Sequence, residues 1–169
     1  MTSFNIQIID DFLPKKYFNK IKKIAGQMDW GALELHYEKQ HGKHVWFSKN
    51  VIDDVELKDQ LIKSIRSKTS YPIKDFKILF FTLAPKTEIF PHIDVGEGFK
   101  YQMILYVDGS IEMNKGTGFF LPTKTGITMN THVGFNKNRA VFFNSGVWHS
   151  PLIYASDNAI PRISIIAQF

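Results

Sequence analysis

The sequence has 169 residues, of which 44% are apolar and 14% aromatic, so it is long enough for one packed domain and too apolar for a disordered chain. It contains no cysteine, which excludes disulfides, thiolate catalysis and zinc–thiolate sites. The formal net charge of +5 permits an acidic partner without requiring one. The lysines are widely spread and most dense on a predicted helix, so we do not expect nucleic-acid binding. We expect a single domain over residues 1–169 of a cytoplasmic protein, with neither a signal peptide nor a membrane span.

Two helices are predicted in the N-terminal part of the chain. The first follows Pro14 and ends near Gly26. The apolar residues on its buried face, spaced by three or four, are Phe18, Ile21, Ala25 and Met28. The second is predicted over Val55–Lys68, with Asp53 or Asp54 as its N-cap. Its apolar stripe is Leu57, Leu61 and Ile65. The stretch between the two helices, 30–51, gives no clear pattern.

Short apolar, aromatic and β-branched runs dominate the chain after Pro72, and turn residues separate them. Together with one strand before the first helix, the predicted strands are Phe4–Ile9, Phe76–Leu83, Ile89–Ile93, Tyr101–Val107, Thr117–Leu121, Ile127–Thr131, Arg139–Phe143, His149–Tyr154 and Ile163–Phe169. Many short strands with turn signals between them are typical of a sandwich or barrel. We therefore expect a mainly β fold, with a barrel core over residues 73–169 and an N-terminal helical layer over residues 1–72.

His92 and Asp94 are the first candidate metal ligands. Residues two apart on a strand point to the same face, so both side chains can reach one ion. Two imidazoles and one carboxylate form the set that binds non-haem Fe(II) by one face and leaves the other open. His149, at the start of a late predicted strand, is the best third ligand. A single His-x-Asp is common by chance, and a lone strand histidine is usually packed or hydrogen-bonded, so the weight rests on the combination.

Arg162 and Ser164 provide the further element. By the same alternation they share a strand face, where Arg can bind a carboxylate bidentately and the Ser hydroxyl can add a hydrogen bond. The alternative is a surface Arg on the last strand. A buried Arg would require a partner, and a bound diacid would supply one.

The ordered set His92-x-Asp94, His149, Arg162-x-Ser164 resembles the Fe(II)/2-oxoglutarate-dependent oxygenase superfamily, most of all its prolyl-hydroxylase-like branch. The segments that support the resemblance are Asp11–Pro14, Tyr101–Asp108, Gly116–Pro122 and Asn138–Asn144. The resemblance covers about residues 76–169. It implies a double-stranded β-helix, the jelly-roll barrel of that superfamily, and an enzyme that uses Fe(II), 2-oxoglutarate and O2.

The resemblance also implies roles for individual residues. His92, Asp94 and His149 would be the iron ligands, and Arg162 would bind the distal carboxylate of 2-oxoglutarate with help from Ser164. Tyr106 would add its hydroxyl to that carboxylate, although a core Tyr that needs only some hydrogen-bond partner is as good a reading. Gln102 shares a strand face with Tyr106 and is expected to line the same pocket.

Several functions are compatible with this pattern. The leading one is hydroxylation of a C–H bond in a peptidyl residue, an amino acid or a small metabolite. Nucleic-acid demethylases of the same superfamily resemble the pattern but carry a second Arg six residues after the first, where this chain has Gln168. The remaining alternatives are a jelly-roll binding module without activity, and a cupin-like dioxygenase or isomerase that needs no keto acid.

Overall fold

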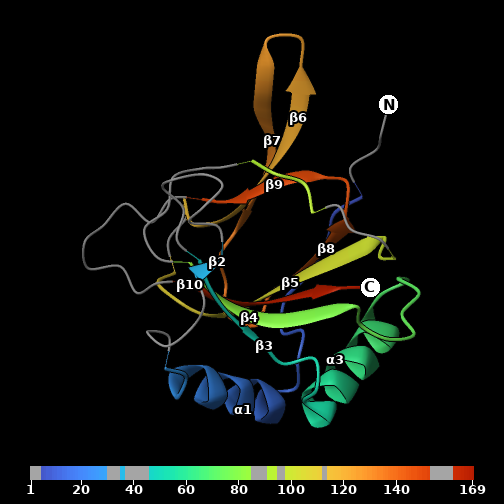
Figure 1. The fold of residues 1–169 in the computed structure, drawn as a ribbon, viewed down its shortest axis with the longest axis vertical. Coiled ribbons are helices and arrows are strands. Elements are labelled where there is room, and N and C mark those ends of the chain that lie inside the picture. Colours follow the sequence, from blue (N-terminus) through green and yellow to red (C-terminus); the bar gives the residue numbers. More distant parts are fainter. Residues whose placement is uncertain are drawn as a thin grey trace.

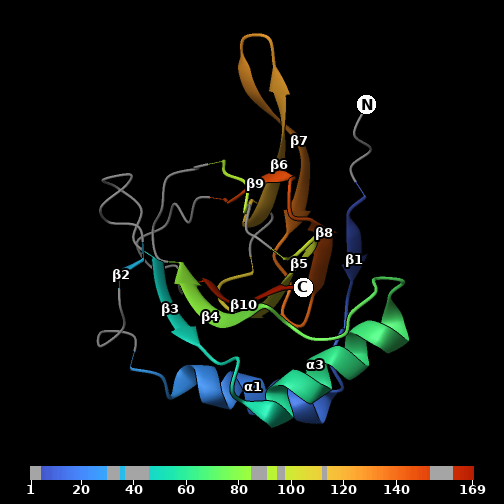
Figure 2. The same cartoon turned by 45° about the vertical axis from the view of Figure 1, so that its right-hand side comes forward.

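The computed structural model describes residues 5–29, 35–36, 46–84, 91–94, 98–111, 114–152 and 162–169, and these form two antiparallel sheets with two helices outside them. The large sheet contains, in spatial order, β1 (Gln7–Ile9), β8 (Ala140–Asn144), β5 (Tyr101–Asp108), β10 (Arg162–Gln168), β4 (Ile78–Ala84), β3 (Trp46–Asn50) and β2 (Leu35–His36). The small sheet contains β7 (Gly126–Gly134), β6 (Gly116–Thr123) and β9 (Trp148–Pro151). Figures 1 and 2 show the small sheet on one side of the large sheet and the helices on the other.

Two apolar cores follow from this layering. Alternation along each strand sends successive side chains to opposite faces of the large sheet. One face packs beneath the helices, where the buried residues include Leu61, Ile65, Leu79, Leu105 and Phe142. The other face forms the inter-sheet core, which contains Ile104, Tyr106, Phe119, Val133, Phe135, Val141, Phe143 and Ile166. The polar side chains of the predicted site project into this second core.

The two helices form as the sequence predicts. Helix α1 spans Lys15–Gly26, directly after Pro14, and buries Phe18, Ile21 and Ala25. Helix α3 spans Val55–Lys68 and begins at Asp54, whose Oδ1 accepts a hydrogen bond of 3.0 Å from the Leu57 N–H. The prediction left Asp53 and Asp54 open, and the structure selects Asp54. Within the described residues, no helix is long and apolar enough to cross a membrane.

Asn138 ties the N-terminal segment to the barrel. It adopts a left-handed backbone conformation with φ 64°, which short polar residues tolerate better than most. Its side-chain amide donates to the Leu13 carbonyl and accepts from the Leu13 N–H, both at 2.9 Å. Its own carbonyl accepts from the Phe12 N–H at 2.9 Å. These bonds hold the start of α1 against the turn before β8.

Most predicted strands are observed with shifts of one or two residues at their ends. Strand β5 extends Tyr101–Val107 by one residue, and β10 begins at Arg162, one residue before the prediction. The stretch 30–51, which gave no clear pattern, contains β2 and β3. Strand β3 pairs with β4, and β2 pairs with β3 at the edge of the large sheet. Phe4 and Tyr154, at the ends of two predicted strands, lie outside the described residues. The single domain over residues 1–169 stays a prediction.

A hairpin made by β6 and β7 extends away from the body of the molecule (Figures 1 and 2). Thr117 pairs with Val133 near its base, and Thr123 pairs with Gly126 at its tip. The first half of β6 is buried, whereas most of β7 is exposed, including the side chains of Ile127 and Met129. The base of this hairpin therefore belongs to the inter-sheet core, while its tip lies in solvent.

Candidate functional site

His92 and His149 come together through the main chain. The His92 N–H donates to the His149 carbonyl and the His149 N–H donates to the His92 carbonyl, both at 2.9 Å. The sequence predicted a strand over Ile89–Ile93, and this is wrong for the residues described. His92 makes only an isolated antiparallel bridge, and residues 85–90 lie outside the described part of the chain. This single bridge is sufficient to bring the predicted ligands together, because it places His92 and Asp94 beside β9.

The three predicted metal ligands lie in one cluster. Their ligand atoms are all within 4.8 Å of one another. Nε2 of His92 lies 3.6 Å from Oδ1 of Asp94, and Nε2 of His149 lies 3.6 Å from the other oxygen of that carboxylate. These separations match two imidazoles and a carboxylate that share one ion at about 2 Å from each. The donor set therefore fits a divalent metal held by one face.

His149 is oriented and kept neutral by its surroundings. Its Nδ1 lies 3.0 Å from the Val147 carbonyl, which can only accept, so Nδ1 carries the proton and Nε2 offers its lone pair toward Asp94. Burial lowers the pKa of His149 to about 4, and the neighbouring His92 adds to this effect, whereas Asp94 and the hydrogen bond to Val147 oppose it. A neutral imidazole with a free Nε2 is the form that binds a metal.

Arg162 is buried in the inter-sheet core. It is 4% exposed, and its Nη1 donates to the Gly116 carbonyl at 2.7 Å and to the Thr117 hydroxyl at 3.4 Å. The guanidinium also lies over the Tyr106 ring, 5.7 Å from its centroid. The prediction of a buried Arg on the last strand is thus confirmed, and the alternative of a surface Arg is excluded.

Two buried polar atoms of β10 lack hydrogen-bond partners among the described residues. They are Nε of Arg162 and the hydroxyl oxygen of Ser164. Ser164 is fully buried and pairs across the sheet with Tyr106, so all three residues line one patch. Buried donors without partners are costly, and a carboxylate placed between them would accept from both. The patch therefore fits the distal carboxylate of a diacid.

Thr117 is a site residue that the sequence analysis missed. The Tyr106 hydroxyl donates to its Oγ1 at 2.8 Å, and Arg162 reaches the same oxygen. Burial raises the pKa of Tyr106 above its ordinary value, against the opposing effects of the Arg162 charge and the Thr117 hydrogen bond, so its phenol stays protonated. A Thr at the start of a predicted strand carries no local signal of this role, because its partners come from β5 and β10.

The buried patch formed by Arg162, Ser164 and Tyr106 is adjacent to the cluster of His92, Asp94 and His149. On β6, Thr117 shares a face with Phe119, and Phe119 pairs directly with His149 on β9. The Arg162 charge is close enough to contribute to the lowered pKa of His149. Gln102 lies at the metal end, since its Nε2 is 3.5 Å from Nε2 of His149. The structure thus places all seven predicted site residues in or beside the inter-sheet core.

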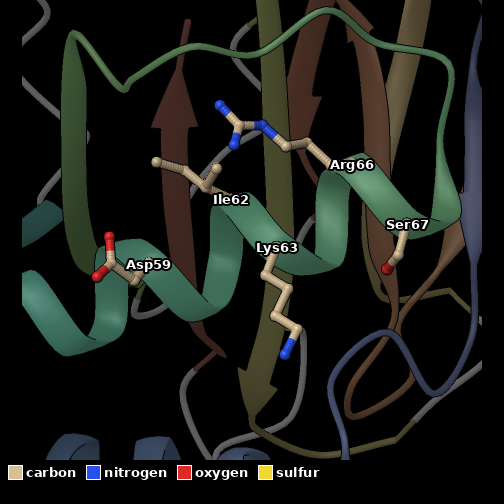
Figure 3. Close-up of a pocket in the computed structure, with 5 residues that line it drawn as sticks. All are labelled: Asp59, Ile62, Lys63, Arg66 and Ser67. Atoms are coloured by element: carbon tan, nitrogen blue, oxygen red, sulfur yellow. The ribbon is translucent and has the colours of Figure 1, made fainter.

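A shallow hollow on the outer helical layer does not belong to this site. Figure 3 shows its side chains on the single helix α3. They are Asp59, Ile62, Lys63, Arg66 and Ser67. Arg66 already donates twice to the Ile73 carbonyl at 3.2 Å, so its guanidinium serves the fold.

No family model matches the sequence, and a search of curated proteins gives no significant match. Solved structures do resemble it. A prolyl-4-hydroxylase from Pseudomonas putida superposes with a TM-score of 0.65 at 18% identity, over 99% of this chain and 93% of the other. A prolyl hydroxylase from Trichoplax adhaerens, in complex with a peptide fragment of the hypoxia inducible factor oxygen degradation domain, gives 0.64 at 13% identity, over 97% and 83%.

A third solved structure is HygX from Streptomyces hygroscopicus, which contains nickel, 2-oxoglutarate and hygromycin B. It superposes with a TM-score of 0.60 at 8% identity, over 98% of this chain and 83% of the other. These likenesses confirm the predicted fold, a mainly β double-stranded β-helix. The resemblance to the 2-oxoglutarate oxygenases and to their prolyl-hydroxylase-like branch is confirmed at the level of fold.

Proposed function

We propose that the protein is an Fe(II)- and 2-oxoglutarate-dependent dioxygenase that hydroxylates a C–H bond of a peptidyl residue, an amino acid or a small metabolite. The observation that carries the proposal is the pairing of two features within one core. A cluster of two His and one Asp fit to bind a metal lies beside a buried Arg whose Nε and neighbouring Ser164 hydroxyl lack partners among the described residues.

Each residue of the site has a role in this proposal. His92, Asp94 and His149 hold the metal, and His149 remains neutral at physiological pH because burial lowers its pKa. Arg162 neutralises the distal carboxylate of the keto acid, while Ser164 and the Tyr106–Thr117 hydroxyl pair add hydrogen bonds. Bound there, Fe(II) with 2-oxoglutarate and O2 would supply oxidative decarboxylation to succinate and CO2, coupled to hydroxylation of the substrate.

Succinate release tests the proposal directly. Purified protein with Fe(II), 2-oxoglutarate and air is expected to form succinate slowly even without a substrate. His92→Ala and Asp94→Ala should abolish this release while the fold survives. Arg162→Ala should raise the KM for 2-oxoglutarate at least tenfold, the size of one charge-assisted hydrogen bond. Arg66→Ala, an Arg variant on the outer helical layer, is the matched control and should leave the KM unchanged.

The outcomes separate the alternatives. A wild-type protein that forms no succinate under any tested condition would indicate a binding module and contradict the proposal. An oxidation that requires Fe(II) but is indifferent to 2-oxoglutarate and to Arg162→Ala would indicate a cupin-like enzyme.

Once succinate release is established, stimulation by added compounds identifies the substrate class. Peptides and aminoglycosides come first, because two of the similar structures contain a peptide fragment and hygromycin B. Stimulation by methylated oligonucleotides would instead favour a demethylase. The cytoplasmic location stays a prediction.

A further inference from the structure

Two glutamines face each other in the wall of the inter-sheet core. Gln102 on β5 and Gln168 on β10 are direct cross-strand partners, and they are 1% and 5% exposed. Buried amides need hydrogen bonds, and this pair supplies one, from Gln168 Nε2 to Gln102 Oε1 at 3.3 Å. The roles proposed above do not use Gln168.

This hydrogen bond decides which way the Gln102 amide points. Because Oε1 accepts from Gln168, the amide nitrogen is directed to the opposite side, where it lies 3.5 Å from Nε2 of His149. That imidazole nitrogen is the one with a free lone pair, since Nδ1 donates to the Val147 carbonyl. The Gln102 N–H therefore points at the lone pair that a metal would take.

Metal binding would remove the acceptor of this N–H. An amide nitrogen has no lone pair to give to a cation, so Gln102 cannot become a ligand through it. At 3.5 Å from Nε2 of His149, the Gln102 nitrogen is as near to that atom as the Asp94 carboxylate is, so it borders the metal position although it cannot bind the metal. With a metal in place, this N–H would need an oxygen acceptor among the metal's other ligands.

We infer that Gln102 donates a hydrogen bond to the metal-bound carboxylate oxygen of the keto acid, and that Gln168 is the positioning residue that fixes the amide in the donating orientation. This inference rests on the proposed function and extends it, because it assigns a second anchor for the keto acid at the metal end. Arg162 anchors the distal carboxylate, and Gln102 anchors the carboxylate at the metal.

The test measures keto-acid binding without turnover. Under anaerobic conditions, 2-oxoglutarate is titrated into protein loaded with Fe(II), and the visible charge-transfer band of the chelate gives the Kd. Gln102→Met, which keeps the volume and removes the donor, should weaken binding about ten- to hundredfold, as expected for one hydrogen bond to a charged acceptor. Gln168→Met should weaken it less, about threefold or more. The Gln102→Met/Gln168→Met double variant should match Gln102→Met alone, because Gln168 acts through Gln102.

Gln102→Glu distinguishes this role from a structural one. The carboxylate still accepts from Gln168 but presents a negative oxygen in place of the donor, so keto-acid affinity should fall at least tenfold without loss of Fe(II) affinity. Gln7→Met, in β1 of the same sheet, is the control and should change nothing. Thermal unfolding of each variant checks that the fold is retained.

Three outcomes would contradict all or part of the inference. If the wild-type protein forms no chelate band with Fe(II) and 2-oxoglutarate, the proposed function fails and the inference fails with it. If the band forms and Gln102→Glu and Gln102→Met bind the keto acid as tightly as wild type, only the inference is overturned. Strict additivity of the two Met variants would remove the positioning role of Gln168.

Discussion

The hydroxyl pair of Tyr106 and Thr117 offers a test of the inter-sheet packing that needs neither metal nor substrate. Both residues are fully buried, and their oxygen atoms are 2.8 Å apart. Thr117→Val removes one hydroxyl with little change of shape, and Tyr106→Phe removes the other. The double variant removes both, which leaves no buried hydroxyl of this pair without a partner.

The expected loss in the free energy of unfolding depends on which hydrogen-bond partners each variant retains. After Thr117→Val, the Tyr106 hydroxyl retains only the Val133 carbonyl at 3.4 Å, so the loss should be about 1–2 kcal/mol, in the range for an unsatisfied buried group. Tyr106→Phe should cost about 1 kcal/mol, because Thr117 still accepts from Arg162 at 3.4 Å. The double variant should lose only about 1 kcal/mol, which gives a coupling energy of about 1–2 kcal/mol.

Urea unfolding of the metal-free protein, followed by tryptophan fluorescence, measures all four free energies of unfolding. Thr125→Val, at the exposed tip of the β6–β7 hairpin, is the control and should change stability by less than about 0.5 kcal/mol. If the two single losses add within about 0.3 kcal/mol in the double variant, the hydroxyls do not share a hydrogen bond and this description of the patch is wrong.

Three further changes test other parts of the structure. Burial lowers the pKa of His149 to about 4, from about 6.5 in the unfolded chain, so the unfolded chain binds more protons between these two pH values. The free energy of unfolding should therefore fall by up to about 3 kcal/mol as the pH is lowered from 6.5 to 4. His149→Gln should flatten this pH dependence. Asn138→Ala should lower the free energy of unfolding in urea by about 3 kcal/mol, because it removes two hydrogen bonds to Leu13 and puts an alanine at a positive φ. Asn138→Gly removes the same hydrogen bonds without the backbone strain and should cost less. An equal loss for both variants would show that backbone strain contributes nothing. Gly118→Ala should cost about 1–2 kcal/mol, because the added carbon would lie 2.9 Å from Cδ2 of Leu152; full additivity with Leu152→Ala would contradict that contact.

The sequence alone predicts a helix or strand well where the segment itself contains the residues that define its face and its ends. Helix α3 is found where it is predicted, because an apolar stripe and two candidate N-cap aspartates lie within or next to its own sequence. Strands β2 and β3 are missed, because β3 is defined by its pairing with β4, whose residues lie thirty or more positions further along the chain. The strand β5 is a nearly continuous apolar run that is buried on both faces, and its prediction differs from the structure only at one end.

The site residues also fall into those that the sequence predicts and those that it does not. The proposed ligands and Arg162 are predicted because their side chains are chemically distinctive and their order along the chain resembles a known superfamily. Thr117 and Gln168 are ordinary residues whose importance comes from partners on other strands, as in the Gln168–Gln102 bond between residues 66 positions apart. The sequence pattern around either residue does not indicate such a contact.

The reciprocal pair of main-chain hydrogen bonds between His92 and His149 has a consequence for how the metal would be acquired. Since these bonds involve no side-chain atoms, the two α-carbons cannot separate unless both bonds break, whether or not an ion is present. Little conformational entropy is then left for the ion to remove from this part of the backbone. Deuterium should consequently exchange slowly at both amides in the apoprotein, and addition of the ion should slow it little further.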